Sequence, residues 1–316
     1  MNLGAVVVTW NSSELIGPCV EALLRNFEGP IVVVDNASQD GTGQAVPKNE
    51  RVRVLTLEEN LGFAGGVNRG VRALETGFVL VLNPDCLVEG GLATLEHAAR
   101  DGASGGLLLD ESGQAQRGFV FRSFPTPAAL IFEVLGINRL IPGNPVNRRY
   151  RCLDRPLNLD QEVDQPAGAF LCFRRDAFET VGGFSESYWP VWFEDVEFCQ
   201  SLIRSGYRIR FTPAAVARHQ GAGSIRKIRW SSKELAWYGS LLRYATRQFG
   251  WLSRRLVGLA VAAASVPRAL TGILFRHQRA SALGVYARVV YLAIGVIVFG
   301  REDVRRSPLP RGSALQ

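Results

Sequence analysis

Short apolar runs alternate with amphipathic segments between residues 3 and 82. The runs at residues 3–9, 30–35, 52–57 and 78–82 are rich in Val and too short for helices, which predicts buried strands. The segments between them have helical character. Because a strand, helix, strand order gives parallel pairing with right-handed crossovers, we expect an α/β sheet with helices on its faces.

Polar residues follow the predicted strands at their carboxyl ends. The run 78–82 leads into Asn83-Pro84-Asp85, where Pro84 removes a backbone donor and ends the strand. Ligands bind at this edge of open α/β sheets, and an Asp there can hold a divalent cation that in turn holds a diphosphate. An ordinary turn would explain Asn-Pro-Asp equally well.

A glycine-rich segment opens the helix predicted after residue 60. Gly62, Gly65 and Gly66 let a ligand approach the backbone at a helix N-terminus, where phosphate is favoured. The segment contains neither Gly-x-Gly-x-x-Gly nor Gly-Lys-Ser/Thr, which argues against dinucleotide-binding and P-loop proteins.

The second half of the pattern predicts strands at 168–174 and 207–212, with aromatic and acidic residues between them. Trp189 and Trp192 come just before Glu194 and Asp195, at the predicted start of a helix that runs to residue 205. Acids at a helix start complement its dipole. A carboxylate beside aromatic rings that stack on sugars can also take a proton from a hydroxyl.

His219 is one of only three histidines, and a Gly-x-Gly-Ser stretch follows it. A histidine at this place can complete a metal shell, although a lone histidine is also common on a surface or in a core. The pattern is weaker from residue 92 to about residue 165, and the segment 125–166 is interpreted as a variable insertion or a mobile cover over a site.

The chain becomes basic and apolar after residue 225. The uncharged runs 256–266 and 289–300 are flanked by arginines, and Pro267 interrupts the first. Neither run reaches the length of a membrane-spanning helix, so we interpret them as anchors at a membrane surface. A helical cap on the core, a homo-oligomer interface and a full membrane crossing extended through Arg288 are the alternatives.

Composition narrows the class of protein. Forty-seven per cent of the 316 residues are hydrophobic and 21% are charged, which is typical of a globular protein. The net charge of +7 comes almost wholly from arginine and gathers in the apolar tail, so we expect no nucleic-acid partner. The five cysteines lack paired spacing and the N-terminus lacks signal-peptide features, which indicates a reducing, cytoplasmic location.

Several motifs together resemble those of family 2 glycosyltransferases of the GT-A fold, particularly the bacterial rhamnosyltransferase-like branch. The resemblance covers about residues 3–225. Its motifs are Val6-Val-Val-Thr-Trp-Asn11, Val34-Asp-Asn-Ala-Ser-Gln-Asp-Gly-Thr42, Asn60-Leu-Gly-Phe-Ala-Gly-Gly-Val-Asn68, Asn83-Pro-Asp85, Gly168-Ala-Phe170, Gly182-Gly-Phe184, Phe193-Glu-Asp195 and His219-Gln-Gly-Ala-Gly-Ser224.

This resemblance implies an inverting enzyme that uses a dTDP- or UDP-sugar and a divalent cation, Mg²⁺ or Mn²⁺. Asp195, beside Glu194, would be the general base, and Asp85 and His219 would hold the metal. The family's metal motif often begins with Asp, and the uncharged Asn83 stands there instead. The residues implied to bind the nucleotide sugar are Thr9, Asn11, Asp35, Asn60, Gly62, Asn68 and Asn83, and those implied to line the sugar and acceptor pocket are Gly168, Ala169, Trp189 and Trp192.

The resemblance also implies an organisation and an acceptor. Residues 1–225 would form a GT-A domain, with a mixed, mostly parallel sheet flanked by helices, and residues 226–316 a helical extension. The acceptor would be a polyprenyl-diphosphate-linked sugar or a polysaccharide, and the enzyme would lie on the inner face of the cell membrane. A catalytically idle nucleotide-sugar-binding protein and a nucleotidyltransferase of similar topology are the alternatives.

Overall fold

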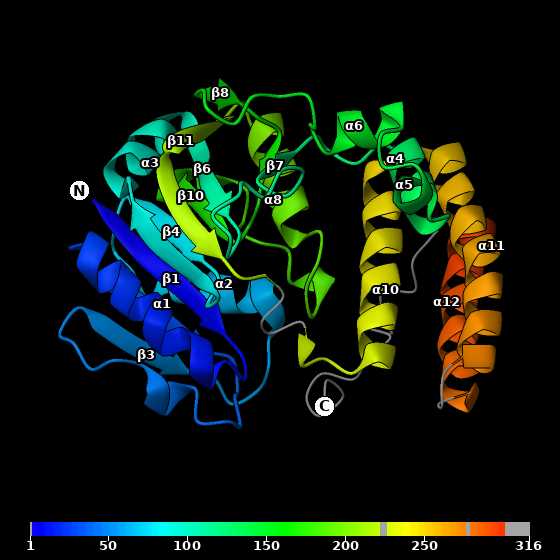
Figure 1. The fold of residues 1–316 in the computed structure, drawn as a ribbon, viewed down its shortest axis with the longest axis horizontal. Coiled ribbons are helices and arrows are strands. Elements are labelled where there is room, and N and C mark those ends of the chain that lie inside the picture. The colour runs from blue at the N-terminus through cyan, green and yellow to red at the C-terminus, as the bar shows by residue number, and fades with distance from the viewer. Residues whose placement is uncertain (1, 222–225, 276–278, 301–316) are drawn as a thin grey trace. The chain divides into compact units, whose positions relative to one another are not determined.

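The computed structural model describes residues 2–221, 226–275 and 279–300 (Figure 1). The chain forms two compact units. The first comprises Met1–Phe124, Arg151–Ser187 and Glu194–Lys227, and the second comprises Pro125–Tyr150, Tyr188–Phe193 and the chain from Ile228 onward. The second unit therefore takes in two segments from the first 225 residues, and the domain boundary at residue 225 stays a prediction.

The first unit is built on a nine-stranded mixed sheet in the order β3-β2-β1-β4-β10-β6-β11-β5, with β8 beside β11. β1, β2, β3 and β4 are parallel, β10 is antiparallel to β4 and β6, and β11 is again parallel to β6. The strands are β1 (Leu3–Thr9), β2 (Ile31–Asp35), β3 (Val52–Thr56), β4 (Phe78–Leu82), β5 (Cys86–Gly90), β6 (Gly102–Leu109), β8 (Gln161–Glu162), β10 (Phe170–Arg174) and β11 (Arg208–His219), and β7 (Phe121–Arg122) pairs separately with β9 (Gln165–Pro166).

Helices flank this sheet, as the alternation of apolar runs predicts (Figure 1). Val6 and Val8 of β1 are buried because α2 packs directly on that strand, where Gly66 and Gly70 leave room for them. A cluster of stacked and tilted rings from Phe173, Phe178, Phe184 and Phe198 adds to the core. The helices of this unit are α1 (Ser13–Asn26), α2 (Gly62–Arg72), α3 (Leu92–Ala98), α7 (Arg175–Thr180) and α8 (Glu194–Arg204).

Two strands differ from the expectation. The chain does not leave the sheet after Asp85 but returns at once as β5, and the last strand continues beyond residue 212 to His219. β5 and β11 pair with each other, with His219 opposite Cys86. Neither β5 nor the end of β11 has a clear apolar pattern in its own sequence, because each is stabilised as a strand by hydrogen bonds to the other.

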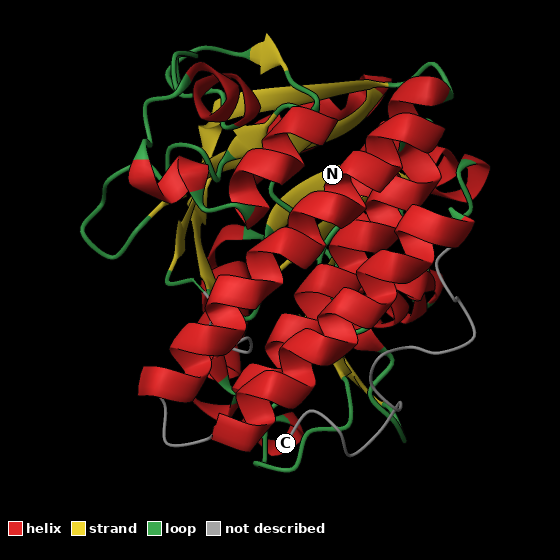
Figure 2. Ribbon diagram, turned by 90° about the vertical axis from the view of Figure 1, so that its right-hand side faces the viewer, coloured by secondary structure: helices red, strands yellow, loops and turns green. Residues whose placement is uncertain are grey.

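The second unit is helical. It contains α4 (Pro127–Val134), α5 (Ile137–Leu140), α6 (Pro145–Tyr150), α10 (Trp230–Gln248), α11 (Trp251–Phe275) and α12 (Arg279–Phe299). The three long helices α10, α11 and α12 lie side by side (Figure 2). The expectation that Pro267 interrupts the apolar run is wrong, because α11 continues through it. We attribute this to packing of α11 along α12, which outweighs the roughly 3 kcal/mol that an internal proline costs.

Candidate active site

The carboxyl ends of the parallel strands bring the predicted site residues of the first unit to one edge of the sheet. Thr9 ends β1 opposite Asp35 at the end of β2, and Asp85 follows the end of β4. Because β10 is antiparallel to β4, it begins at this same edge, just after Ala169. The long β11 ends there with His219.

Asp85 and His219 form a buried pair. Oδ1 of Asp85 lies 3.5 Å from Nε2 of His219, and both residues are 5% exposed. Burial lowers the pKa of His219, while the Asp85 carboxylate opposes this shift. The lowered pKa favours the neutral imidazole.

Gln116 fixes which nitrogen of His219 carries the proton. Its amide nitrogen donates to the His219 carbonyl at 2.7 Å, so its amide oxygen faces Nδ1 of the ring at 2.9 Å. Nδ1–H therefore donates to Gln116, and the lone pair of Nε2 faces Asp85. The ring of Phe119 stacks on the imidazole, with centroids 5.2 Å apart, and holds its plane.

This arrangement fits a divalent cation. A carboxylate oxygen and an imidazole lone pair face each other in a buried place, and a cation between them would satisfy both. The hydrogen bond from Nδ1 to Gln116 is the kind of outer contact that orients metal-binding histidines. Asp85, Cys86 and His219 each offer one ligand atom, and the three atoms lie within 4.8 Å of one another.

A short backbone segment connects this pair to Asp195. The backbone nitrogen of Asn83 donates to the carbonyl of Ala169 at 3.0 Å, and the backbone nitrogen of Gly168 donates to Oδ2 of Asp195 at 3.3 Å. A side chain at Gly168 would lie 3.1 Å from the Asp195 side chain, so the glycine allows the close approach. The predicted metal and base residues are therefore held at one edge through residues 168–169.

Asp195 is a partly buried carboxylate at the start of α8. Burial raises its pKa, and the backbone N–H groups of Val196 and Gly168 and the nearby Arg122 charge oppose this shift. The amide nitrogen of Gln165 also donates to its Oδ2 at 3.1 Å. A raised pKa makes a carboxylate a better proton acceptor, which suits a general base.

The residues expected to hold the nucleotide surround the ends of β1 and β2. Asn11 has a left-handed φ of 48°, and its side-chain oxygen accepts a hydrogen bond from the Gln39 backbone. Asp35 is 5% exposed and accepts one from the Ser38 backbone. These side chains shape the loop after β2 and lie beside Thr9, which is buried. Their nucleotide role stays a prediction.

Asn60, Gly62 and Asn68 shape and brace the start of α2. The side-chain oxygen of Asn60 accepts from the Gly62 backbone nitrogen, and Gly62 has a φ of 74°, which favours glycine. The amide of Asn68 donates to the Phe184 carbonyl and to Glu186, and its oxygen accepts from the Phe184 backbone nitrogen. The structure thus gives Asn68 a bracing role between α2 and the loop that follows α7.

Comparisons with known proteins identify the family of this chain. The model of glycosyl transferase family 2 matches residues 5–113, and a model described as the N-terminal domain of galactosyltransferase matches residues 148–222. An N-acetylglucosaminyl-diphospho-decaprenol L-rhamnosyltransferase of Mycobacterium tuberculosis is 32% identical over 272 residues, which cover 79% of this chain and 86% of that protein. The chain belongs to glycosyl transferase family 2.

One further relative and one solved structure are similar to this chain in sequence and in fold, respectively. Rhamnosyltransferase WbbL of Escherichia coli K12 is 27% identical over 189 residues, which cover 58% of this chain and 66% of that protein. The mannosyltransferase PcManGT from Pyrobaculum calidifontis, solved with GDP-Man and Mn²⁺, is similar in fold, with a TM-score of 0.51 at 17% identity over 95% of this chain and 88% of that chain. The expected GT-A fold, the enzyme class and the rhamnosyltransferase-like resemblance are confirmed.

The remaining predicted site residues of this glycosyltransferase lie around residues 188–195. Glu194 is the buried first residue of α8 in the first unit, directly before Asp195. Trp189 and Trp192 belong to the second unit, where Trp189 is buried and Trp192 has a φ of 83°. Their roles stay predictions, as do those of Asn83, Gly168 and Ala169. Ala222, Gly223 and Ser224 of the last motif lie outside the described residues.

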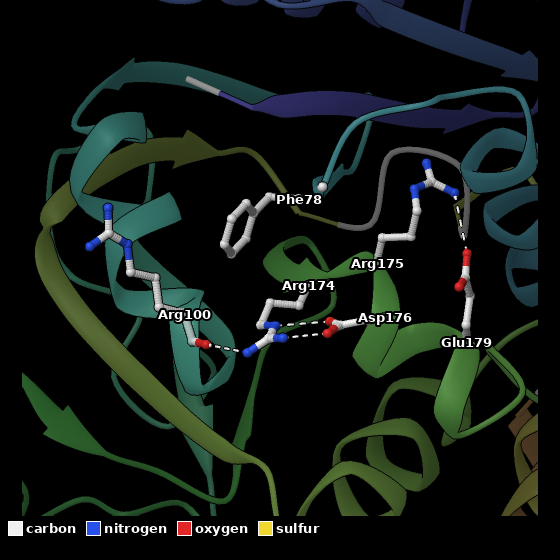
Figure 3. A pocket seen from close by; sticks show the side chains of 7 residues that line it. Phe78, Arg100, Arg174, Arg175, Asp176 and Glu179 are labelled. Atoms are coloured by element: carbon white, nitrogen blue, oxygen red, sulfur yellow. Dashed lines mark hydrogen bonds and ion pairs between the residues drawn. The ribbon is translucent and has the colours of Figure 1, made fainter.

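A cavity of about 520 Å³ in this glycosyltransferase lies at the other end of β4 (Figure 3). It is lined by Gly77, Phe78, Arg100, Arg174, Arg175, Asp176 and Glu179. Arg174 is paired with Asp176, and Arg175 donates to carbonyls at the end of α2 and pairs with Glu179. These charges are already used in structural contacts, and the cavity is separated from Asp85 by the length of the strand.

The sequence pattern did not reveal three residues that support the site. Gln116 orients His219, Gln165 contacts Asp195, and Lys227 donates to the Asn11 carbonyl and lies 3.5 Å from Asp40. Gln116 and Gln165 lie in the weakly patterned middle of the chain. Gln165 lies three residues before the Gly168 motif, which is a sequence signal for it, whereas no motif of the sequence analysis lies beside Gln116.

Proposed function

We propose that this glycosyltransferase moves rhamnose or a related hexose from a dTDP- or UDP-sugar to a hydroxyl of a polyprenyl-diphosphate-linked or polysaccharide acceptor, with inversion. The observation that carries the proposal is the linkage of the Asp85–His219 pair to Asp195 through residues 168–169. The mycobacterial relative, named for rhamnose transfer to an N-acetylglucosaminyl-diphospho-decaprenol, supports the choice of sugar and acceptor.

Asp85 and His219 would hold the divalent cation, Mg²⁺ or Mn²⁺. When bound, such a cation neutralises the charge that develops on a departing diphosphate. Asn83 is uncharged, so Asp85 would supply the negative charge of this motif. Thr9, Asn11 and Asp35 at the ends of β1 and β2 would hold the nucleoside.

Asp195 would take the proton from the acceptor hydroxyl. An attack from the face opposite the leaving diphosphate requires a base on that side, and it inverts the configuration at the sugar carbon. The carboxylate is held by the backbone of Gly168 and Val196, and burial raises its pKa. These contacts and the raised pKa support the role of Asp195 as the base.

Replacement of Asp195 tests the base. We expect Asp195→Asn to lower the rate of transfer on the order of 10²- to 10⁴-fold, because the amide cannot accept the proton. Binding of dTDP or UDP sugars, measured by calorimetry with Mn²⁺ present, should be unchanged. As a matched control, Asp176→Asn alters an exposed acid at the far end of β4 and should leave transfer intact. Near-normal transfer by the Asp195 variant would contradict the assignment.

Two exposed helix faces support a membrane-bound acceptor. On α11, Leu252, Leu256, Leu259, Val266 and Leu270 fall within about 80° around the helix axis at 3.6 residues per turn. Each of these side chains is at least 46% exposed. The opposite face of α11, with Val257, Ala260, Val261 and Ala264, is buried. α12 repeats the arrangement, with Leu283, Tyr291, Ile294 and Val298 exposed and Val285, Val289, Ala293 and Val296 buried.

The charges in this unit favour a lipid surface. From residue 235 to residue 300 the sequence contains no Asp or Glu, whereas arginines recur through it. Arg255 lies over the ring of Trp251 at the start of α11, and such pairs are typical of the interface between water and lipid. An anionic membrane would match both features, because its acyl region would receive the apolar faces and its headgroups would bind the arginines.

We therefore infer that the helical unit holds the enzyme on the cytoplasmic face of the membrane. Within the described residues, α12 contains one 18-residue stretch, Ala282–Phe299, with the length and mean hydropathy of a membrane span, and a third of it is buried. By composition alone this is weak evidence for a crossing. The exposed apolar face on each of the two helices favours binding at the surface, and self-association of these faces is the alternative.

A further inference from the structure

Cys86 lies directly beside the Asp85–His219 pair. It begins β5, and the antiparallel register places it opposite His219 of β11. Side chains of residues that face each other across two strands lie on the same side of the sheet. The thiol of Cys86 therefore lies on the same side of the sheet as the imidazole of His219, and Cys86 is fully buried.

The three side chains have nearly the spacing of metal ligands. One ligand atom each from Asp85, Cys86 and His219 lies within 4.8 Å of the other two. Ligand atoms around a tetrahedral zinc ion are about 3.3–3.7 Å apart, given the usual zinc–ligand bond lengths. The Asp85–His219 separation of 3.5 Å already meets this spacing, and a shift of about 1 Å would bring the sulfur to it.

The donor set distinguishes between classes of cation. Mg²⁺ and Mn²⁺ prefer oxygen ligands and gain little from sulfur, whereas Zn²⁺, Co²⁺ and Cd²⁺ bind thiolates strongly. A site with one oxygen, one nitrogen and one sulfur donor therefore suits this second class. A fourth position would remain for water or a substrate oxygen.

We propose that Cys86 is a third ligand that lets a thiolate-preferring cation such as Zn²⁺ occupy the Asp85–His219 site and exclude Mn²⁺. This inference rests on the metal site in the proposed function. On binding, the Cys86 thiol loses its proton to solvent, and the sulfur forms a bond to the metal in place of its contact with the Ala169 carbonyl, now 3.4 Å long. Zn²⁺ would thus act as an inhibitor that competes with the catalytic cation.

Cobalt gives a direct test, because sulfur bound to Co²⁺ produces an intense near-ultraviolet charge-transfer band. We expect this band when Co²⁺ is added to the full-length protein under reducing conditions, and its loss in Cys86→Ser. The serine hydroxyl can still donate to the Ala169 carbonyl, so the fold should be kept; Cys86→Ala provides a second variant without any donor. Cys152→Ser, another buried cysteine with a side-chain partner, Ser123, is the matched control and should keep the band.

Mn²⁺ binding, followed by electron paramagnetic resonance, separates this inference from the proposed function. Zn²⁺ should displace Mn²⁺ from the unaltered protein at a lower concentration than from Cys86→Ser. If Mn²⁺ binds but Co²⁺ gives no charge-transfer band, or the band persists in Cys86→Ser, then Cys86 is not a ligand. If neither protein binds Mn²⁺, Co²⁺ or Zn²⁺, the metal site itself is wrong.

Discussion

At the scale of single residues, two glutamines contact the side chains that we propose as metal ligand and as base. Gln116 fixes the tautomer of His219, and Gln165 donates to Asp195. Neither is itself a group that accepts a proton or binds a cation strongly. Each determines how another side chain presents its lone pairs, so we expect their replacement to change pH dependence or metal affinity rather than the fold.

Gln165→Leu should move the acid limb of the pH–rate profile. The hydrogen bond from Gln165 stabilises the ionised form of Asp195, so its loss raises a pKa that burial has already raised. Only the carboxylate accepts a proton, so activity is present above this pKa and disappears as the pH falls through it. We expect the limb to shift to higher pH by about half to one unit, the equivalent of one hydrogen bond.

The control for this measurement is Gln161→Leu. Gln161 also donates through its amide, but to the exposed Pro156 carbonyl. Its replacement should leave the profile in place. If Gln165→Leu lowers the rate equally at every pH, its role is structural and the positioning role is refuted.

At the scale of elements, α2 approaches β1 closely because two of its residues lack side chains. A Cβ at Gly66 would lie 2.5 Å from Val8, and one at Gly70 would lie 2.4 Å from Val6. These glycines are one helical turn apart and face the same strand. Their absence of side chains, rather than a need for unusual backbone angles, explains their positions.

We expect Gly66→Ala and Gly70→Ala each to lower the free energy of unfolding by about 1–3 kcal/mol through overpacking. Urea denaturation followed by circular dichroism would measure this. In Gly17→Ala, a helical glycine of α1, the new methyl group meets only the Ala45 carbonyl at 3.4 Å. That variant should be unchanged or up to about 1 kcal/mol more stable, since alanine favours helix. Equal stability of all three variants would contradict close packing of α2.

The sequence predicted elements whose pattern is local. Residues 3–9 and 78–82 are recognisable as strands from their own apolar runs, and Asp85 follows from the strand that precedes it. β5 and the end of β11 depend on pairing across more than 120 residues, which a local pattern does not contain. The roles of Gln116 and Gln165 were also not predictable, because they arise from contacts with His219 and Asp195, which are distant in sequence. The prediction that Pro267 interrupts the apolar run failed, because packing between α11 and α12 offset the tendency of proline to end a helix.

At the scale of the whole molecule, a catalytic unit and an apolar helical unit occur in one chain. An acceptor with a polyprenyl anchor remains in the membrane, so an enzyme that uses it gains from binding the same surface. The exposed stripes of α11 and α12 and the absence of acids from residue 235 to residue 300 are the features that support this arrangement.

Vesicle flotation tests this property. The full-length protein should float with vesicles that contain phosphatidylglycerol, and less with vesicles of phosphatidylcholine alone, because its arginines bind anionic headgroups. Leu256→Glu combined with Leu259→Glu should abolish flotation. Leu159→Glu, an exposed leucine of the first unit, is the matched control and should float normally. A protein that stays unbound but forms a dimer disrupted by the same double change would favour self-association of α11 instead.

The pairing of β4 with β10 has a consequence for how this enzyme could be altered. Asn83 follows β4 and Gly168 precedes the neighbouring strand β10. The separation between Asp85, the proposed metal ligand, and Asp195, the proposed base, is therefore determined by interstrand spacing and not by loop length. If the loop after β2 holds the nucleoside as proposed, it can therefore be lengthened or exchanged to accept a different one while the distance between Asp85 and Asp195 stays constant. A single residue inserted between Leu82 and Asp85 would disturb that distance, and no compensating change in a distant loop would restore it.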